Sequence, residues 1–78
     1  MDFSEALKAC KGGQAIQRAG WNGKGMYVQI QRVDPSDAGT HTRTAIGLPY
    51  LYLLTADGRT VPWTISQTDA LAEDWQIV

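Results

Sequence analysis

The segment from Gly20 to Gly25 holds three glycines, a tryptophan and an asparagine within six residues. An indole such as Trp21 can stack on a nucleobase, Asn22 can hydrogen-bond its polar edge, and glycine amides can approach a phosphate closely. Generic phosphate motifs do not fit, because a P-loop requires Ser or Thr after Gly-Lys and Gly25 stands there instead. On pattern alone, a turn with a packed tryptophan is favoured over a ligand site.

Trp63 and Trp75 raise the same question, since a small core has little room for three tryptophans. Trp75 lies beside Ile77 and Val78, which predicts a core or subunit-interface position. Trp63 follows Pro62 and precedes polar residues, so it is the better candidate for a pocket wall. Ser66 is a typical helix N-cap, and the unpaired amides of a helix start also attract anions.

Catalytic chemistry has little support in the sequence. The single histidine, His41, falls in a polar loop, and the single cysteine, Cys10, falls on an apolar helix stripe typical of a core residue. One Cys and one His cannot supply a tetrahedral zinc site, and no intrachain disulfide is possible. Solvated surface charges are the interpretation favoured for two acidic pairs, Asp34 with Asp37 and Glu73 with Asp74. With no assembled nucleophile, base and oxyanion donor, we expect neither an enzyme nor a cofactor.

The elements that position these residues follow from hydrophobic periodicity and turn signals. Asp2 and Glu5 form a predicted capping box, and Gly12 with Gly13 ends the first helix. The predicted helices cover residues 3–11 and 67–72; the predicted strands cover 14–18, 26–32, 49–55, 60–63 and 75–78; a polar loop covers 34–42. The sequence therefore predicts one α+β domain over residues 1–78, an antiparallel sheet of four to five strands with two short helices.

Three details of this sheet are predicted as well. Either Ala15 or Ile16 points inward from the first strand, and Asp57-Gly58 signals a two-residue hairpin. Pro62 indicates an edge position or a strand end. The strand over 49–55 is apolar on both faces and a short helix covers only one face, so the other face is expected to meet another subunit.

Charge and length exclude several function classes. Seven Lys+Arg against eight Asp+Glu give a formal net charge of −1, which argues against a DNA- or RNA-binding surface. The apolar stretch from Leu48 to Leu54 is too short to span a bilayer and is interrupted by Pro49. The acidic start lacks the apolar region of a secretory signal, so a cytoplasmic location is expected. A chain of this length buries only about 60% of its unfolded surface, which favours a homo-oligomer.

Several blocks together resemble a known family: Gly20 to Met26, Thr55 to Gly58, Val61 to Trp63, Ser66 to Asp69 and Ala72 to Trp75. The chain is similar to small phage and prophage proteins whose characterised members are Thoeris anti-defence proteins of the second-described type. The resemblance implies a molecular sponge that sequesters a cyclic ADP-ribose isomer, the alarm signal of Thoeris immunity. It also implies a homotetramer with ligand pockets between protomers. Some relatives also trap cyclic oligonucleotide signals, so a sponge for cyclic oligonucleotides is an alternative.

The resemblance also implies which residues contact the ligand. Carried over by motif, they are Trp21, Asn22, Gly23, Lys24, Met26, Trp63, Ser66, Gln67 and Asp69. Arg18, Lys24 or Arg43 are further candidates for the pyrophosphate. The chain departs from the family between Val33 and Leu48, so the choice of ligand stays open. The alternatives are an oligomeric structural or interaction protein without nucleotide binding, and an enzyme that hydrolyses the signal.

Overall fold

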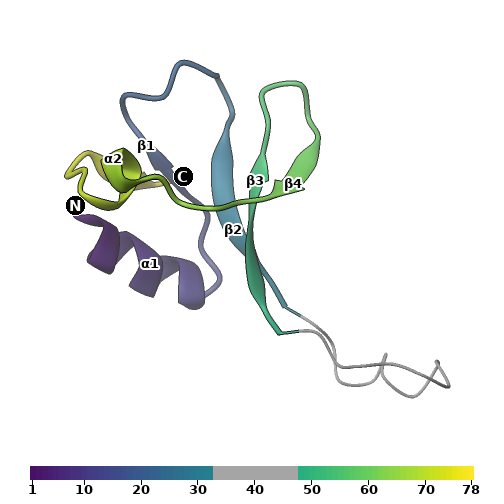
Figure 1. The fold of residues 1–78 in the computed structure, drawn as a ribbon, viewed down its shortest axis with the longest axis horizontal. Coiled ribbons are helices and arrows are strands. Elements are labelled where there is room, and N and C mark those ends of the chain that lie inside the picture. The colour runs from purple at the N-terminus through teal and green to yellow at the C-terminus, as the bar shows by residue number, and fades with distance from the viewer. Residues whose placement is uncertain (33–47) are drawn as a thin grey trace, which may run out of the picture.

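The computed structural model describes residues 1–32 and 48–78, and it has the predicted α+β architecture. Five antiparallel strands form one sheet in the order β4-β3-β2-β1-β5, so that β4 and β5 are its edges. Figure 1 shows β2, β3 and β4 side by side. The elements are α1 (Phe3–Lys11), β1 (Ile16–Arg18), β2 (Tyr27–Gln31), β3 (Tyr50–Leu54), β4 (Thr60–Pro62), α2 (Gln67–Ala70) and β5 (Trp75–Ile77). The predicted polar loop, with Asp34, Asp37 and His41, lies outside the described residues, and so does Arg43.

Helix α1 begins and ends as its sequence predicts. The Asp2 carboxylate accepts a hydrogen bond from the Glu5 amide at 2.9 Å, and the Glu5 side chain accepts one from the Asp2 amide at 3.5 Å. At the other end Gly12 is the C-cap, and Gly13 has a φ of +99°, which a residue with a side chain rarely adopts. These capping contacts fix where α1 begins and ends.

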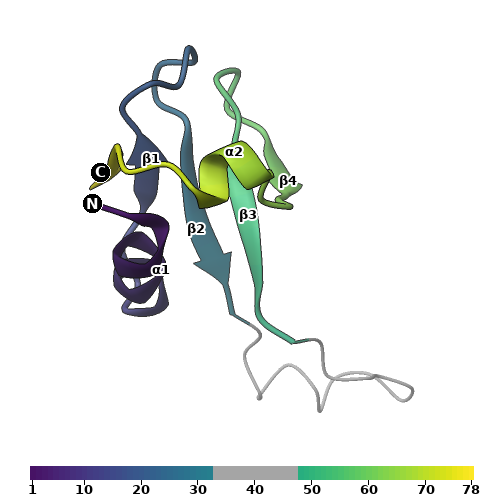
Figure 2. The same ribbon diagram turned by 60° about the vertical axis from the view of Figure 1, so that its left-hand side comes forward.

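Both helices lie on the same face of the sheet. In Figure 2, α2 crosses in front of β2 and β3, and α1 lies below β1. Five buried residues form the core between α1 and the sheet: Ala6 and Cys10 of α1, with Ile16, Val28 and Trp75 of the strands. Ile16, and not Ala15, is therefore the inward residue of β1. We call the side of the sheet that carries the helices the inner face, and the opposite side the outer face.

The antiparallel register divides β2 and β3 between the two faces. Val28 pairs with Leu53, and this pair belongs to the inner face because Val28 is in the core. The alternate pair Gln29 and Tyr52 therefore lies on the outer face, together with Tyr50. No helix of the described residues is long and apolar enough to cross a membrane.

The hairpin between β3 and β4 differs from its prediction. The Thr55 amide donates to Arg59 O at 2.7 Å and the Gly58 amide to Thr55 O at 3.0 Å, so the loop comprises the three residues between Thr55 and Arg59. Gly58 has a φ of +86°, whereas Asp57 has no positive φ. A two-residue type I′ turn needs a positive φ at both positions, which explains the longer loop. The edge position of Pro62 is confirmed.

Helix α2 is also shorter than predicted and ends at Ala70 rather than at residue 72. The Asp69 carbonyl accepts hydrogen bonds from the Ala72 amide at 3.3 Å and from Trp75 Nε1 at 2.9 Å. In a continuing helix this carbonyl would accept the amide of Glu73. The indole of Trp75 takes that place, and the chain turns into β5.

Candidate functional site

The three tryptophans, which are far apart in the sequence, form one aromatic cluster. The ring centroids of Trp21 and Trp75 lie 5.4 Å apart, those of Trp63 and Trp75 6.1 Å, and those of Trp21 and Trp63 6.4 Å, all in edge-to-face geometry. Phe3 of α1 packs on Trp75 at 5.2 Å. Trp75 is buried, as expected, while Trp21 and Trp63 stay half-buried. Trp21 therefore combines a packing role with a surface that solvent reaches.

Asp69 of α2 connects this cluster to the helix start. Its Oδ1 atom accepts a hydrogen bond from Trp21 Nε1 at 3.4 Å, and its carbonyl accepts one from Trp75 Nε1 at 2.9 Å. Its own amide donates to Ser66 Oγ at 3.1 Å, which confirms Ser66 as the N-cap. One residue thus holds the indole N–H groups of two tryptophans.

Arg18 joins the same network from β1. Its Nη1 lies 2.7 Å from Asp69 Oδ1 and its Nε lies 2.7 Å from Asp74 Oδ1. The second oxygen of Asp74 accepts the Gly20 amide at 3.0 Å, so the carboxylate also fixes the start of the glycine-rich segment. Sequence reasoning placed Asp74 among solvated charges and Arg18 among the phosphate contacts, and it missed this network. The signal lies in the β1–β5 register, which pairs Arg18 with Trp75 directly after Asp74.

The network shifts the pKa values of its members in opposite directions. Hydrogen bonds to Asp74 and Asp69 raise the pKa of Arg18. The pKa of Asp74 is lowered, first by the bond from Arg18 and, against the effect of burial, by the Gly20 amide. For Asp69, burial alone would raise the pKa, but hydrogen bonds from Arg18, Ser66 and Trp21 together outweigh it and lower the pKa. Both carboxylates are therefore ionised at neutral pH.

The other predicted contacts lie at different places around this network. Gly23 packs on Met26, since a Cβ atom at Gly23 would lie 2.1 Å from Met26 Sδ and 3.3 Å from Ala56 Cβ of the β3–β4 loop. Residues Asn22, Lys24 and Gln67 are exposed. The structure thus joins Trp21, Trp63, Ser66 and Asp69 in one cluster and Gly23 with Met26 in another. We call the first set, with Arg18 and Asp74, the tryptophan site.

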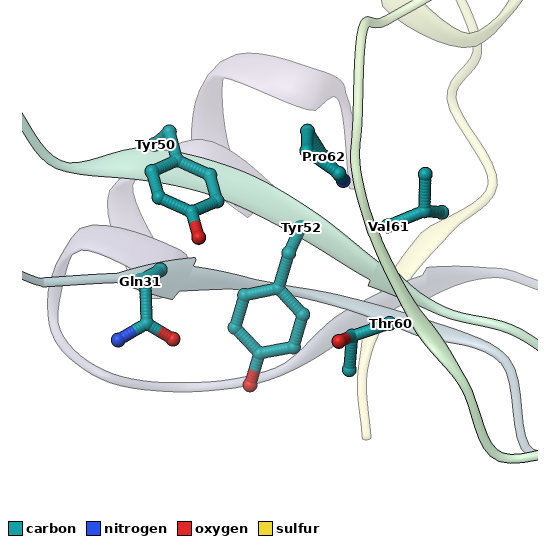
Figure 3. A pocket seen from close by; sticks show the side chains of 6 residues that line it. All are labelled: Gln31, Tyr50, Tyr52, Thr60, Val61 and Pro62. Atoms are coloured by element: carbon teal, nitrogen blue, oxygen red, sulfur yellow. The ribbon is translucent and has the colours of Figure 1, made fainter.

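A separate cavity lies on the outer face, at the β4 edge, and sequence reasoning did not predict it (Figure 3). It is lined by Gln31, Tyr50, Tyr52, Thr60, Val61 and Pro62. The Tyr52 hydroxyl donates to Gln29 Oε1 at 2.9 Å, and Gln29 Nε2 donates to Gly13 O at 3.1 Å. The volume is about 170 Å³, below the range of about 300–1,000 Å³ that is typical of small-molecule sites. The described residues of one chain therefore do not form a nucleotide-sized pocket at this place.

Cys10 is not a candidate nucleophile in this fold. It is buried in the core, and its Sγ lies 4.0 Å from Val28 O. Burial raises the pKa of the thiol above its ordinary value, which keeps the thiol protonated at neutral pH. This agrees with the core position that its place on the helix stripe predicted.

Comparison with known proteins gives the same family as the sequence motifs. The profile of the Thoeris anti-defense 2-like domain matches residues 1–78. A protein of Bacillus phage SP01, named Thoeris anti-defense 2, is 42% identical over 84 aligned residues, which include 100% of this chain and 94% of the relative. The matched blocks include the tryptophan site together with the sheet that positions it. The chain therefore belongs to the Thoeris anti-defense 2-like family.

Proposed function

We propose that this anti-defense protein is a non-enzymatic sponge, which binds a cyclic ADP-ribose isomer in the cytoplasm of the infected cell and withholds it from the defence system. The membership of the family supports the anti-defense role. The observation that carries the binding role is Trp21, a half-buried indole held in a fixed orientation beside the glycine-rich segment. Packing on Trp63 and Trp75 leaves part of this ring accessible to solvent, and an accessible indole surface can stack on a base.

The surroundings of Trp21 suggest how the rest of the ligand is held. The adenine base stacks on the indole, with Trp63 at the side. The pyrophosphate meets the amides of the segment from Asn22 to Gly25 and the exposed ammonium group of Lys24. Arg18 is not assigned to the pyrophosphate, because both of its 2.7 Å partners are carboxylates of the same chain.

Sequestration without turnover is supported by the kind of groups present at the site. Indoles, amides and an ammonium group stabilise the bound ground state, and groups that bind ground and transition state equally do not accelerate a reaction. The one thiol of the chain, that of Cys10, is buried in the core and is protonated at neutral pH. The proposed site therefore holds its ligand unchanged.

We further propose that the working form is a homotetramer and that the outer face is a subunit interface. Tyr50 is 48% exposed on this face, and Tyr52 and Leu54 of the same strand lie beside it. Both helices cover the opposite face. Light scattering behind a sizing column should give four times the 8.6 kDa chain mass, about 34 kDa. A mass near 8.6 kDa at micromolar protein would contradict the tetramer.

Isothermal titration calorimetry tests the binding proposal. The protein is titrated with a cyclic ADP-ribose isomer, with linear ADP-ribose as the matched control ligand and a cyclic dinucleotide as the competing class. The proposal predicts saturable heat with the cyclic ADP-ribose isomer and far weaker binding of the linear compound. Heat with the cyclic dinucleotide alone would show that the protein binds cyclic oligonucleotides and not a cyclic ADP-ribose isomer. Heat with none of the three would overturn the proposal.

A further inference from the structure

We infer that Asp69 is a positioning residue, which fixes the orientation of the Trp21 ring for the ligand, and that it does not contact the ligand itself. This inference rests on the proposed base-stacking role of Trp21. It changes the assignment that motif similarity gives to Asp69, which places it among the ligand contacts. The reason is the number of partners that its carboxylate already has within the chain.

Within the described residues, the Asp69 carboxylate accepts two side-chain hydrogen bonds, both at its Oδ1 atom. Oδ1 accepts Arg18 Nη1 at 2.7 Å and Trp21 Nε1 at 3.4 Å, and the side chain is only 17% exposed. The Arg18 charge faces Asp69 and Asp74 together, so the two aspartates and the arginine form one compact group. An anionic ligand that approached Asp69 directly would meet a carboxylate with like charge.

The effect on Trp21 follows from the geometry of an indole. Packing against Trp63 and Trp75 restricts the ring position. A hydrogen bond to Nε1 adds a directional contact, because it holds the N–H edge of the ring toward its acceptor. Asp69 supplies that bond. Since the Asp69 carbonyl also holds Trp75 Nε1, a shift of α2 would move the bonds of both tryptophans together. The ring orientation of Trp21 is therefore coupled to the position of α2.

A double-mutant cycle with Asp69→Ala and Trp21→Phe tests the inference. Phenylalanine keeps a ring but has no N–H for Asp69 to hold. We expect Asp69→Ala to weaken binding of the cyclic ADP-ribose isomer about tenfold when Trp21 is present, as for the loss of a hydrogen bond to a charged group. In the Trp21→Phe background, the same substitution should change affinity less than about threefold. Asp2→Ala is the control for removing an aspartate near the start of a helix, because Asp2 caps α1 and its carboxylate accepts the Glu5 amide.

A second readout needs no ligand. With ¹⁵N-labelled tryptophan, the indole N–H signal of Trp21 should shift in Asp69→Ala and stay in place in Asp2→Ala. An equal loss of affinity in both backgrounds would show that Asp69 contacts the ligand directly, and would overturn the inference. An unmoved Trp21 signal would also overturn it. If the wild-type protein binds none of the tested nucleotides while the signal shifts as expected, the function proposal fails and the positioning of Trp21 stands.

Discussion

Replacing Trp75 with alanine should cost more stability than any other single tryptophan substitution. Trp75 is 2% exposed, packs on Phe3, Trp21 and Trp63, and donates its indole N–H to Asp69 O at 2.9 Å. Truncating a core tryptophan typically costs about 3–5 kcal/mol, and the lost hydrogen bond adds about 1 kcal/mol. The expected loss in free energy of unfolding is therefore about 4–6 kcal/mol.

This loss is large compared with the stability that the chain can have. At about 0.05–0.15 kcal/mol per residue, a domain of this length has roughly 4–12 kcal/mol in total. Trp75→Ala should therefore be unfolded or nearly so at 37 °C, or melt at least about 15 °C lower than the wild type. Urea unfolding followed by circular dichroism measures the difference, at one fixed protein concentration because assembly contributes to apparent stability. Trp63→Ala is the comparison. If half-buried Trp63 proves the costlier of the two truncations, the reasoning that ranks the tryptophans by burial is wrong.

Three further predictions concern the tryptophan site and its surroundings. Trp21→Ala should weaken binding of the cyclic ADP-ribose isomer by about 1–3 kcal/mol, because base stacking is lost. Calorimetry measures the affinity, on samples whose fold is checked by circular dichroism. Unchanged affinity would show that Trp21 does not contact the ligand. Gly23→Ala should lower the melting temperature, because its Cβ would lie 2.1 Å from Met26 Sδ. Adding Met26→Ala to this variant should restore part of the lost melting temperature. A double variant that melts no higher than Gly23→Ala would contradict this contact. The folded-state pKa values of Asp69 and Asp74 lie below the ordinary 3.8. The two ionised carboxylates therefore stabilise the fold above that pH, and this stabilisation is lost as the pH falls through the lowered pKa values. Free energy of unfolding should fall between about pH 5 and pH 2, and less steeply in Asp74→Asn; parallel pH profiles would refute the role of the carboxylates.

The elements of the fold were predictable where the signal is local. The capping box of Asp2 and Glu5 and the alternation of β2 involve residues within a few positions of each other, and the structure confirms both. Local signals failed where a distant contact decides. Helix α2 ends early because the indole N–H of Trp75 donates a hydrogen bond to the Asp69 carbonyl. The pattern of residues 67–72 cannot predict this bond, because Trp75 lies outside that segment.

The candidate site shows the same division. The three tryptophans were identifiable from residue type, and their difference in burial followed from their neighbours in the sequence. Their assembly into one cluster, and the bonds of Arg18 to Asp69 and Asp74, depend on the pairing of β1 with β5. Sequence spacing does not specify the pairing of strands that are more than fifty residues apart. The role of Arg18 therefore emerged only with the register.

The central claim, sequestration without chemistry, is tested most directly by recovering the ligand. The protein is saturated with a cyclic ADP-ribose isomer, incubated for hours and denatured by heat, and the released nucleotide is identified by chromatography and mass spectrometry. A sample with Trp21→Ala serves as the control for spontaneous breakdown of the ligand. We predict full recovery of the starting nucleotide from the wild-type protein. Linear ADP-ribose in molar excess over the protein, and absent from the control, would show turnover and would contradict the account.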